Sequence, residues 1–383
     1  MRQSRRGQVD PFIVMDVMEA ARQVEAAGRH IIHMEVGQPS TPAPARARAA
    51  LAAALEADAL GYTVALGLPE LRTGIAALYA RWYGVDLDPA RVVVTIGSSG
   101  AFLLAFSALF DAGDRVGLPE PGYPSYRQIL KAMSVQPVPI PTEAANRYLP
   151  RPGDLPDDLQ GLVIASPGNP SGTMADRATL AGLIEAAQAR GAAFISDEIY
   201  HGLHYADRAV SALEISDDVF VINSFSKYFS MTGWRVGWMV VPESHIRTVE
   251  RISQNMFICP PHASQVAALA ALDAVDEAEA MRAVYAENRR LMIEGLPRAG
   301  FDRIAPPDGA FYVYADVSAL TEDSRAFAAE ILAGAGVAVT PGLDFDPARG
   351  AQTLRFSYAR STADIREGLA RLARFMDARK ARG

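Results

Sequence analysis

The chain has 383 residues, half of them hydrophobic and 21% charged, with a formal net charge of −7. This length suits two domains or one large α/β unit with an appended part. No apolar run reaches the roughly 18–20 residues of a membrane span, and the basic residues 1–10 lack the apolar segment of a secretory signal. The negative charge argues against a nucleic-acid partner, and the single cysteine, Cys259, excludes an internal disulfide and predicts a cytoplasmic location.

The first part of the chain predicts a helix, a strand and a second helix. Apolar positions at helical spacing favour an amphipathic helix over residues 10–28. Residues 29–36 predict a short strand, which leads into Gly37, and the Ala-rich residues 44–59 predict the next helix.

A loop and two further elements follow. Residues 61–72 present Tyr62 on a loop and then open a helix, with Pro69 suited to its first turn. Residues 91–96 predict a buried strand that runs into Gly97-Ser98-Ser99-Gly100 and an apolar helix. Strand, small-residue loop and helix start together aim free N–H groups and a helix dipole at an anion. The loop lacks the spacing of a Walker or dinucleotide motif, so this signal is weak alone.

Two more predicted strands deliver side chains to loops. A short strand from Arg115 ends in Pro-Glu-Pro-Gly-Tyr-Pro, a loop-forming sequence that presents Tyr123. Residues 161–166 form the second strand, and Pro-Gly-Asn-Pro-Ser-Gly-Thr follows it with Asn169 inside.

The strand predicted over residues 192–200 ends with Asp197 and Tyr200 three residues apart, and strand alternation would point Glu198 the other way.

We predict no metal site, because two ligands do not make one. This applies to two pairs of histidines: His30 with His33, and His201 with His204.

Residues 220–241 contain the most informative lysine. An apolar strand ends in Ser224-Phe225-Ser226-Lys227, and Arg235 follows eight residues after the lysine. Burial at a strand end would lower the lysine pKa and make its amine a nucleophile toward carbonyl groups. Near the end of the chain, the alternating strand 353–360 carries Arg355, which needs an anionic partner if it points inward.

These motifs, in this order, resemble the class I/II aminotransferases of fold type I, which use pyridoxal 5′-phosphate (PLP). The resemblance rests on Ser-Phe-Ser-Lys with its following arginine, on Asn-Pro-x-Gly-Thr and on Asp-x-x-Tyr, and it spans Gly37 to Arg355. It implies that Lys227 forms the internal Schiff base with PLP and acts in catalysis with Asp197 and Tyr200.

The resemblance also implies the remaining cofactor contacts. Tyr123 would stack on the pyridine ring, Asp197 would pair with its protonated nitrogen, and Asn169 and Tyr200 would hydrogen-bond its phenolate oxygen. The phosphate would be held by Ser98, Ser99, Ser224, Arg235 and Tyr62 of the partner subunit. A phosphate dianion suits a guanidinium fork and hydroxyl donors.

For the substrate, the resemblance implies that Arg355 grips the α-carboxylate, with Gly37 and Asn169 nearby. For the fold, it implies an α/β protein whose three-layer large domain, residues 45–285, has a mostly parallel sheet. A smaller α+β domain would combine residues 1–44 and 286–383. The enzyme would be a homodimer, because Tyr62 would act across the interface.

The expected activity is a ping-pong transfer of the α-amino group of an L-amino acid to a 2-oxo acid. A PLP-dependent C–S β-lyase on the same fold is the alternative. A non-catalytic PLP-binding regulator would need a DNA-binding domain, for which the roughly forty residues before Gly37 are too few. Aspartate, aromatic amino acids, alanine and methionine remain open as donors, with a preference for aspartate or aromatic ones.

Overall fold

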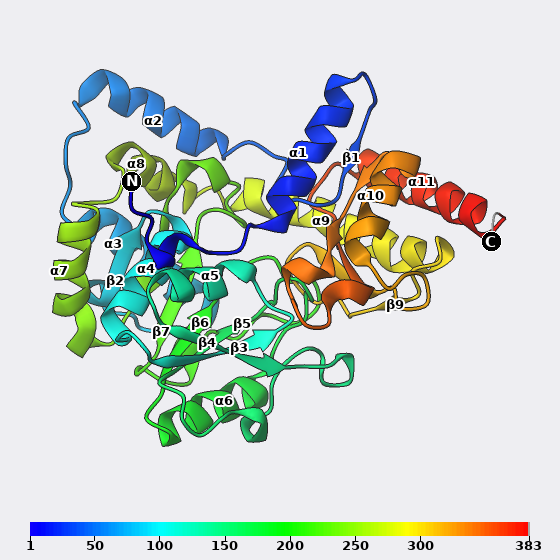
Figure 1. Cartoon of the computed structure of the whole chain (residues 1–383). Helices are drawn as coiled ribbons and strands as arrows, with labels where there is room; N and C mark the ends of the chain where they lie inside the picture. The colour runs from blue at the N-terminus through cyan, green and yellow to red at the C-terminus, as the bar shows by residue number, and fades with distance from the viewer. Residues whose placement is uncertain (382–383) are drawn as a thin grey trace.

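The centre of the fold is a seven-stranded sheet with the strand order β2-β8-β7-β6-β5-β3-β4, seen in a computed structural model that describes residues 1–381 (Figure 1). Strand β8 runs antiparallel to both of its neighbours, β2 and β7, and the other pairs in this sheet are parallel. The strands are β2 (Val92–Thr95), β3 (Arg115–Glu120), β4 (Gln136–Pro141), β5 (Gly161–Ala165), β6 (Ala193–Asp197), β7 (Phe220–Ser224) and β8 (Gly237–Val240).

Both faces of this sheet are apolar. Successive side chains of a strand point to opposite faces, and apolar residues occupy both sets of positions. In β7, for example, Val221 belongs to one buried cluster and Ile222 to the other. Helices α4 (Gly97–Leu109), α5 (Pro124–Ala132) and α7 (Ile246–Met256) contribute to the second cluster, on one face. Helices α3 (Pro69–Tyr83), α6 (Arg177–Ala189) and α8 (His262–Ala271) contribute to the first, on the other face. The predicted α/β fold with a mostly parallel sheet is therefore confirmed.

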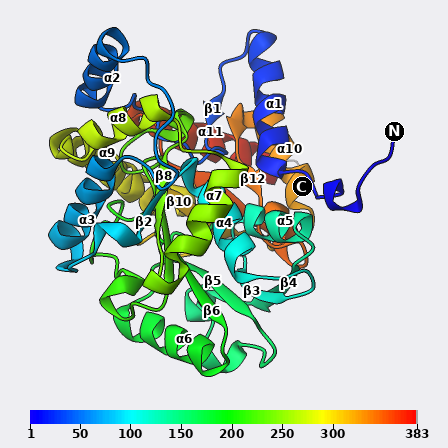
Figure 2. The same ribbon diagram turned by 90° about the vertical axis from the view of Figure 1, so that its left-hand side faces the viewer.

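A smaller part of the chain carries an antiparallel sheet with the order β12-β13-β10-β9. Figure 1 shows it beside the large sheet, and Figure 2 shows the N-terminal segment leading as an arm into α1. Its strands are β9 (Arg303–Ile304), β10 (Tyr312–Asp316), β12 (Thr340–Pro341) and β13 (Thr353–Ser357). The remaining helices are α1 (Ile13–Ala26), α2 (Ala45–Ala57), α9 (Val275–Arg298), α10 (Ser324–Ala335) and α11 (Thr362–Lys380).

The two chain ends meet in this smaller part. Strand β1 (Ile32–His33) pairs in parallel with β11 (Val337–Ala338). The predicted strand over residues 29–36 is thus reduced to two residues, although Met34 still exchanges backbone hydrogen bonds with Ala338 and Ser357. The proposed division into residues 45–285 and the two chain ends stays a prediction, and its boundary near residue 285 falls inside the continuous helix α9.

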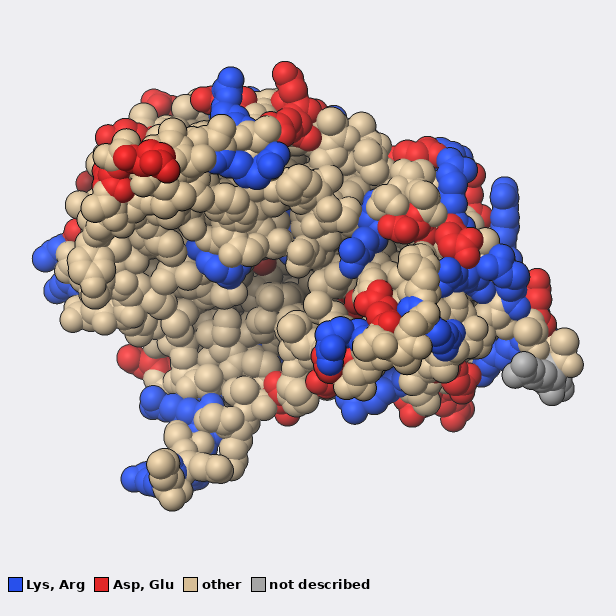
Figure 3. All heavy atoms as spheres, turned by 90° about the horizontal axis from the view of Figure 1, so that it is seen from above, with Lys and Arg blue, Asp and Glu red and all other residues tan. Residues whose placement is uncertain are grey.

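The small-residue segment after β2 also differs from expectation. We predicted Gly97 to Gly100 as a loop, whereas these residues form the first turn of α4, which starts directly after Ile96. The helix start therefore lies closer to the strand end than predicted. In residues 1–381, no helix is long and apolar enough to cross a membrane. Acidic and basic side chains are interspersed over the face seen in Figure 3.

Gly237 tests how closely α4 packs on the sheet. A Cβ at Gly237 would lie 2.9 Å from the carbonyl oxygen of Asn223 and 3.0 Å from the backbone nitrogen of Ser98. Backbone atoms cannot rotate away, so we expect Gly237→Ala to lower the free energy of unfolding by about 1–3 kcal/mol. The control is Gly233→Ala, because a Cβ there meets nothing within 4 Å. Urea denaturation of both variants measures the difference, and equal stabilities would contradict this account of the packing.

Candidate active site

A cavity of about 220 Å³ opens where the parallel strands of the large sheet end. The carboxyl ends of such strands are the usual ligand-binding edge of an α/β sheet. Each of five strands, β2, β3, β5, β6 and β7, is followed or ended by a residue that lines the cavity. In strand order these residues are Ser98, Tyr123, Asn169, Asp197 and Lys227. Because β8 is antiparallel, its beginning lies at the same edge, and Arg235 just before it also lines the cavity.

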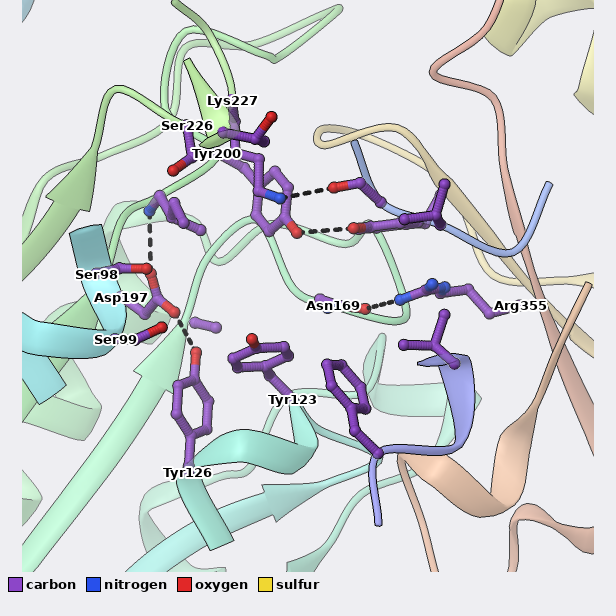
Figure 4. A pocket seen from close by; sticks show the side chains of 18 of the residues that line it. Ser98, Ser99, Tyr123, Tyr126, Asn169, Asp197, Tyr200, Ser226, Lys227 and Arg355 are labelled. Atoms are coloured by element: carbon purple, nitrogen blue, oxygen red, sulfur yellow. Dashed lines mark hydrogen bonds between the residues drawn. The ribbon is translucent and has the colours of Figure 1, made fainter. Parts of the chain in front are cut away.

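Lys227 lies in the turn after β7 with its amine inside the cavity (Figure 4). Its Nζ donates a hydrogen bond of 2.6 Å to the carbonyl oxygen of Gly37 and lies 5.7 Å from the ring centre of Tyr200. Burial, together with the positive charges of Arg355 and Arg235, lowers the pKa of Lys227 to about 8. A substantial fraction of this amine is therefore neutral near pH 8, when it can act as a nucleophile or a base.

Asp197 is a buried carboxylate at the end of β6, with 4% of its surface exposed. The hydroxyl of Tyr126 and the backbone N–H of Ile199, the latter at 3.0 Å, donate hydrogen bonds to it. Burial raises its pKa to about 6, despite these hydrogen bonds and the positive charge of Lys227. A cation bound against this carboxylate would offset the cost of burying its charge. The position therefore suits a protonated ring nitrogen.

An anion site is built from the start of α4 and from Arg235. Helix α4 has no side-chain cap, so its first N–H groups, near Ser98 and Ser99, are available to a ligand. Arg235 has a left-handed backbone with φ 54°, and its guanidinium donates to the carbonyl oxygen of Thr232 at 2.9 Å. A Cβ at Gly97 would lie 2.4 Å from this guanidinium, so the glycine permits the close approach. The two groups together favour a phosphate.

Arg355 extends from β13 toward the cavity, opposite Asp197 in Figure 4, and is 2% exposed. It donates to Asn169 Oδ1 at 2.9 Å and to the carbonyl oxygen of Glu35. Its guanidinium lies between two rings, 4.4 Å from the centre of Tyr312 and 4.7 Å from that of Phe345. In the structure none of these partners carries a full negative charge. A carboxylate that enters the cavity would provide the missing counter-charge.

Aromatic hydroxyls and one glycine define the space between Lys227 and Arg355. The hydroxyls of Tyr200 and Tyr312 are hydrogen-bonded at 2.9 Å. A Cβ at Gly37 would lie 1.7 Å from the Tyr312 hydroxyl, so this position accepts only glycine without a shift of the ring. Tyr123 lines the cavity and contacts Phe12 edge to face at 5.9 Å between ring centres.

The structure brings most of the predicted site residues together but leaves two of them outside the cavity. Ser224 does not line it; its hydroxyl bonds with that of Ser226 at 2.8 Å, and Ser226 lines the cavity instead. Tyr62 is 84% exposed in the single chain and is absent from the lining. Glu198 points away from the cavity, as strand alternation predicted, and accepts hydrogen bonds from Ser211 and the N–H of Ala212.

Several lining residues were missed by the sequence analysis. Tyr126 follows Tyr123 by about one helical turn, a spacing that could have placed it at the same site. No local pattern marks Tyr312, which reaches the cavity from the smaller sheet. No local pattern marks Thr232 either, nor four apolar side chains that line the cavity: Phe12, Val14, Met15 and Val36.

Comparison with known proteins identifies the family. The sequence model of "Aminotransferase class I and II" matches residues 29–372. Valine–pyruvate aminotransferase of Mycobacterium tuberculosis is 48% identical over 378 residues, which cover 97% of each chain. The crystal structure of a Silicibacter pomeroyi protein shares 69% identity and a TM-score of 0.95, covering 99% of this chain and 100% of that one. Aspartate aminotransferase of Thermus thermophilus with maleate shares 31% identity and a TM-score of 0.92, covering 98% and 100%.

These matches extend over nearly the whole chain, and the solved structures have the same arrangement of a large, mostly parallel sheet and a smaller part. Enzymes of this family depend on PLP and act on amino acids and 2-oxo acids. The predicted fold type, cofactor and enzyme class are thus confirmed: the chain belongs to the class I and II aminotransferases, PLP-dependent enzymes that transfer amino groups.

Proposed function

We propose that the cavity is the transamination site, in which Lys227 serves both half-reactions between an L-amino acid and a 2-oxo acid. The observation that carries the proposal is the position of the Lys227 amine. This amine, with a pKa of about 8, shares one cavity with the buried carboxylate of Asp197 and the buried guanidinium of Arg355. An amine that loses its proton easily, an anion for a ring nitrogen and a cation for a carboxylate are the three groups that the reaction needs.

The residues present fit PLP. Ser98, Ser99 and Arg235 would hold the phosphate, and Asp197 would pair with the ring nitrogen. Tyr123 would cover a ring face, while Lys227 would hold the cofactor covalently. Two groups near the ring, the Asn169 amide and the Tyr200 hydroxyl, would hydrogen-bond its phenolate oxygen. When bound, PLP supplies the electron-withdrawing ring that stabilises the carbanion left by loss of the α-proton.

On the substrate side, Arg355 would bind the α-carboxylate. The aromatic rings on both sides of its guanidinium and its hydrogen bond to Asn169 hold it in one orientation. A fixed carboxylate sets the direction of the Cα–H bond, which favours proton removal over other bond cleavages. The Lys227 amine would take this proton, and its lowered pKa keeps a neutral population available for the step.

The cavity favours a neutral, apolar donor such as valine, with pyruvate as the acceptor. In residues 1–381, the charged side chains that line it are Asp197, Lys227, Arg235 and Arg355. Each of them would bind the cofactor or the α-carboxylate. No further cation in this lining would bind a second carboxylate. The relative that is 48% identical is a valine–pyruvate aminotransferase, which agrees with this reading. The proposal departs from the preference for aspartate or aromatic donors drawn from the sequence.

We further propose that two chains form a homodimer through the exposed apolar residues near Tyr62. The segments that carry them contact each other, because the N–H of Thr63 lies 3.4 Å from the Sγ of Cys259. A cluster of large exposed side chains without a partner is typical of an interface. The cluster consists of Tyr62 (84% exposed), Val64 (57%), Ile258 (51%) and Met256 (49%). In such a dimer, Tyr62 of the partner subunit would complete the phosphate site.

The central experiment is a half-reaction. Adding L-valine alone to the PLP-loaded protein should change the visible spectrum of the bound cofactor and release a 2-oxo acid. The Lys227→Ala variant should be slower by at least about 10²–10⁴-fold, because the proton carrier is lost. Lys380→Ala is the matched control, since Lys380 is exposed at the end of α11 and does not line the cavity. Release of pyruvate and ammonia from a cysteine conjugate, with no transfer from any amino acid, would instead indicate a C–S β-lyase.

The lowered pKa of Lys227 predicts a pH dependence for cofactor capture. The protonated amine is not a nucleophile, so PLP-free protein should attach PLP faster as the pH rises and reach a plateau above pH 8. Below the pKa, the neutral fraction falls about tenfold per pH unit. Stopped-flow absorbance measures the rate. Arg355→Met should move the midpoint upward, because Arg355 helps to lower this pKa. A wild-type midpoint near 10.5, the ordinary lysine value, would contradict the prediction.

The dimer can be tested with a matched pair of variants. Val64→Glu should produce a monomer by sedimentation velocity, because a buried, unpaired carboxylate opposes association. Val284→Glu introduces the same charge at an exposed valine of α9, outside the apolar cluster, and should stay dimeric. A monomeric wild-type protein, or a Val64→Glu dimer as stable as that of the wild type, would refute the proposed interface.

A further inference from the structure

The start of α1 forms an apolar wall of the cavity. Phe12, Val14 and Met15 line it from this helix, and Val36 adds a fourth apolar side chain. The Phe12 ring contacts Tyr123 edge to face. The cavity therefore has charged groups for the cofactor and the α-carboxylate, and one apolar surface on which a donor side chain can pack.

The residues just before α1 are held through Asp10, which pairs with Gln128 and Lys131 of α5, but they do not cap the helix. Phe12 occupies the N-cap position and provides no side-chain hydrogen bond. The cap comes from Asp344, which lies 331 residues away along the chain from Ile13. Its Oδ1 accepts the N–H of Ile13 at 3.0 Å, and its Oδ2 accepts the N–H of Val14 at 3.1 Å. Asp344 is 2% exposed, so solvent competes little for these bonds. A carboxylate also interacts favourably with the helix dipole at this end.

Asp344 is also linked to the carboxylate site. It directly precedes Phe345, whose ring centre lies 4.7 Å from the guanidinium of Arg355. One turn, residues 342–345, thus contacts both the helix that bears the apolar wall and the arginine that would bind the substrate. The distance between these two surfaces determines which side chain fits between them.

We infer that Asp344 is a positioning residue that sets donor selectivity by holding the start of α1 at a fixed distance from Arg355. The inference rests on the proposed transamination at this cavity. When the apolar wall contacts the donor amino acid, each additional methyl group of the donor side chain adds binding free energy. When the wall is displaced, the additional methyl group adds none. Asp344 therefore favours a branched apolar donor over alanine.

The test compares L-valine with L-alanine in the half-reaction of the PLP-loaded protein. In Asp344→Asn, one acceptor oxygen becomes an amide donor that faces an N–H group. We expect the ratio of kcat/KM for valine to that for alanine to fall roughly tenfold. The loss should appear mainly in KM for valine, because Lys227 and Arg355 are unchanged. A merely structural role would lower the thermal midpoint without changing this ratio.

Two further variants keep the test decisive. Ile13→Pro removes one of the two N–H donors but leaves Asp344 intact, and proline is tolerated at the first position of a helix. It should change the ratio in the same direction, and it decides the question if Asp344→Asn does not fold. Asp323→Asn is the matched control. Asp323 caps α10 by accepting the N–H groups of Arg325 and Ala326, and this helix does not line the cavity.

Each outcome separates the inference from the function on which it rests. If the wild-type protein transfers no amino group from any amino acid, the proposed function fails. If the wild-type protein reacts with both donors without favouring valine, the inference alone fails. An unchanged ratio in both cap variants, or an equal change in Asp323→Asn, overturns it in the same way.

Discussion

The site depends on keeping one lysine buried near two other cations. Lys227 is surrounded by ring faces and by the charges of Arg355 and Arg235, and the carboxylate of Asp197 only partly offsets these charges. Such an arrangement costs stability unless a ligand with two anionic groups enters. A phosphate against Arg235 and a carboxylate against Arg355 would supply them. The stability that the chain loses to these uncompensated charges is thus regained when a phosphorylated cofactor and an amino-acid substrate bind.

Much of this architecture could be predicted from local sequence. The buried strands ending near Ser98, Asn169, Asp197 and Lys227 are short apolar runs, and their parallel pairing places those side chains at one edge. The predicted helices 10–28 and 44–59 match α1 and α2 to within a few residues, since helix ends depend on weak local preferences, whereas no helix was predicted where α5 lies. The order of the motifs was informative enough to identify the family before any geometry was known.

What could not be predicted depends on contacts between distant parts of the chain. Nothing near Tyr312 indicates that its hydroxyl would meet Tyr200, and nothing near Asp344 indicates that it caps a helix at the other end of the protein. A local cause explains why Ser226, and not the predicted Ser224, lines the cavity. The chain turns directly after β7, so strand alternation no longer determines which hydroxyl faces inward.

The position of Arg355 on a second sheet has a mechanical consequence. Lys227 follows a strand of the large sheet, Arg355 lies on the smaller one, and α9 runs without interruption between the two regions. A helix of 24 residues is a stiff rod of about 36 Å, so it transmits a tilt along its length instead of absorbing it locally. The separation of amine and guanidinium is therefore a property of how the two sheets are joined. A substitution that tilts α9 would therefore change the distance between these two groups, and with it the width of the cavity.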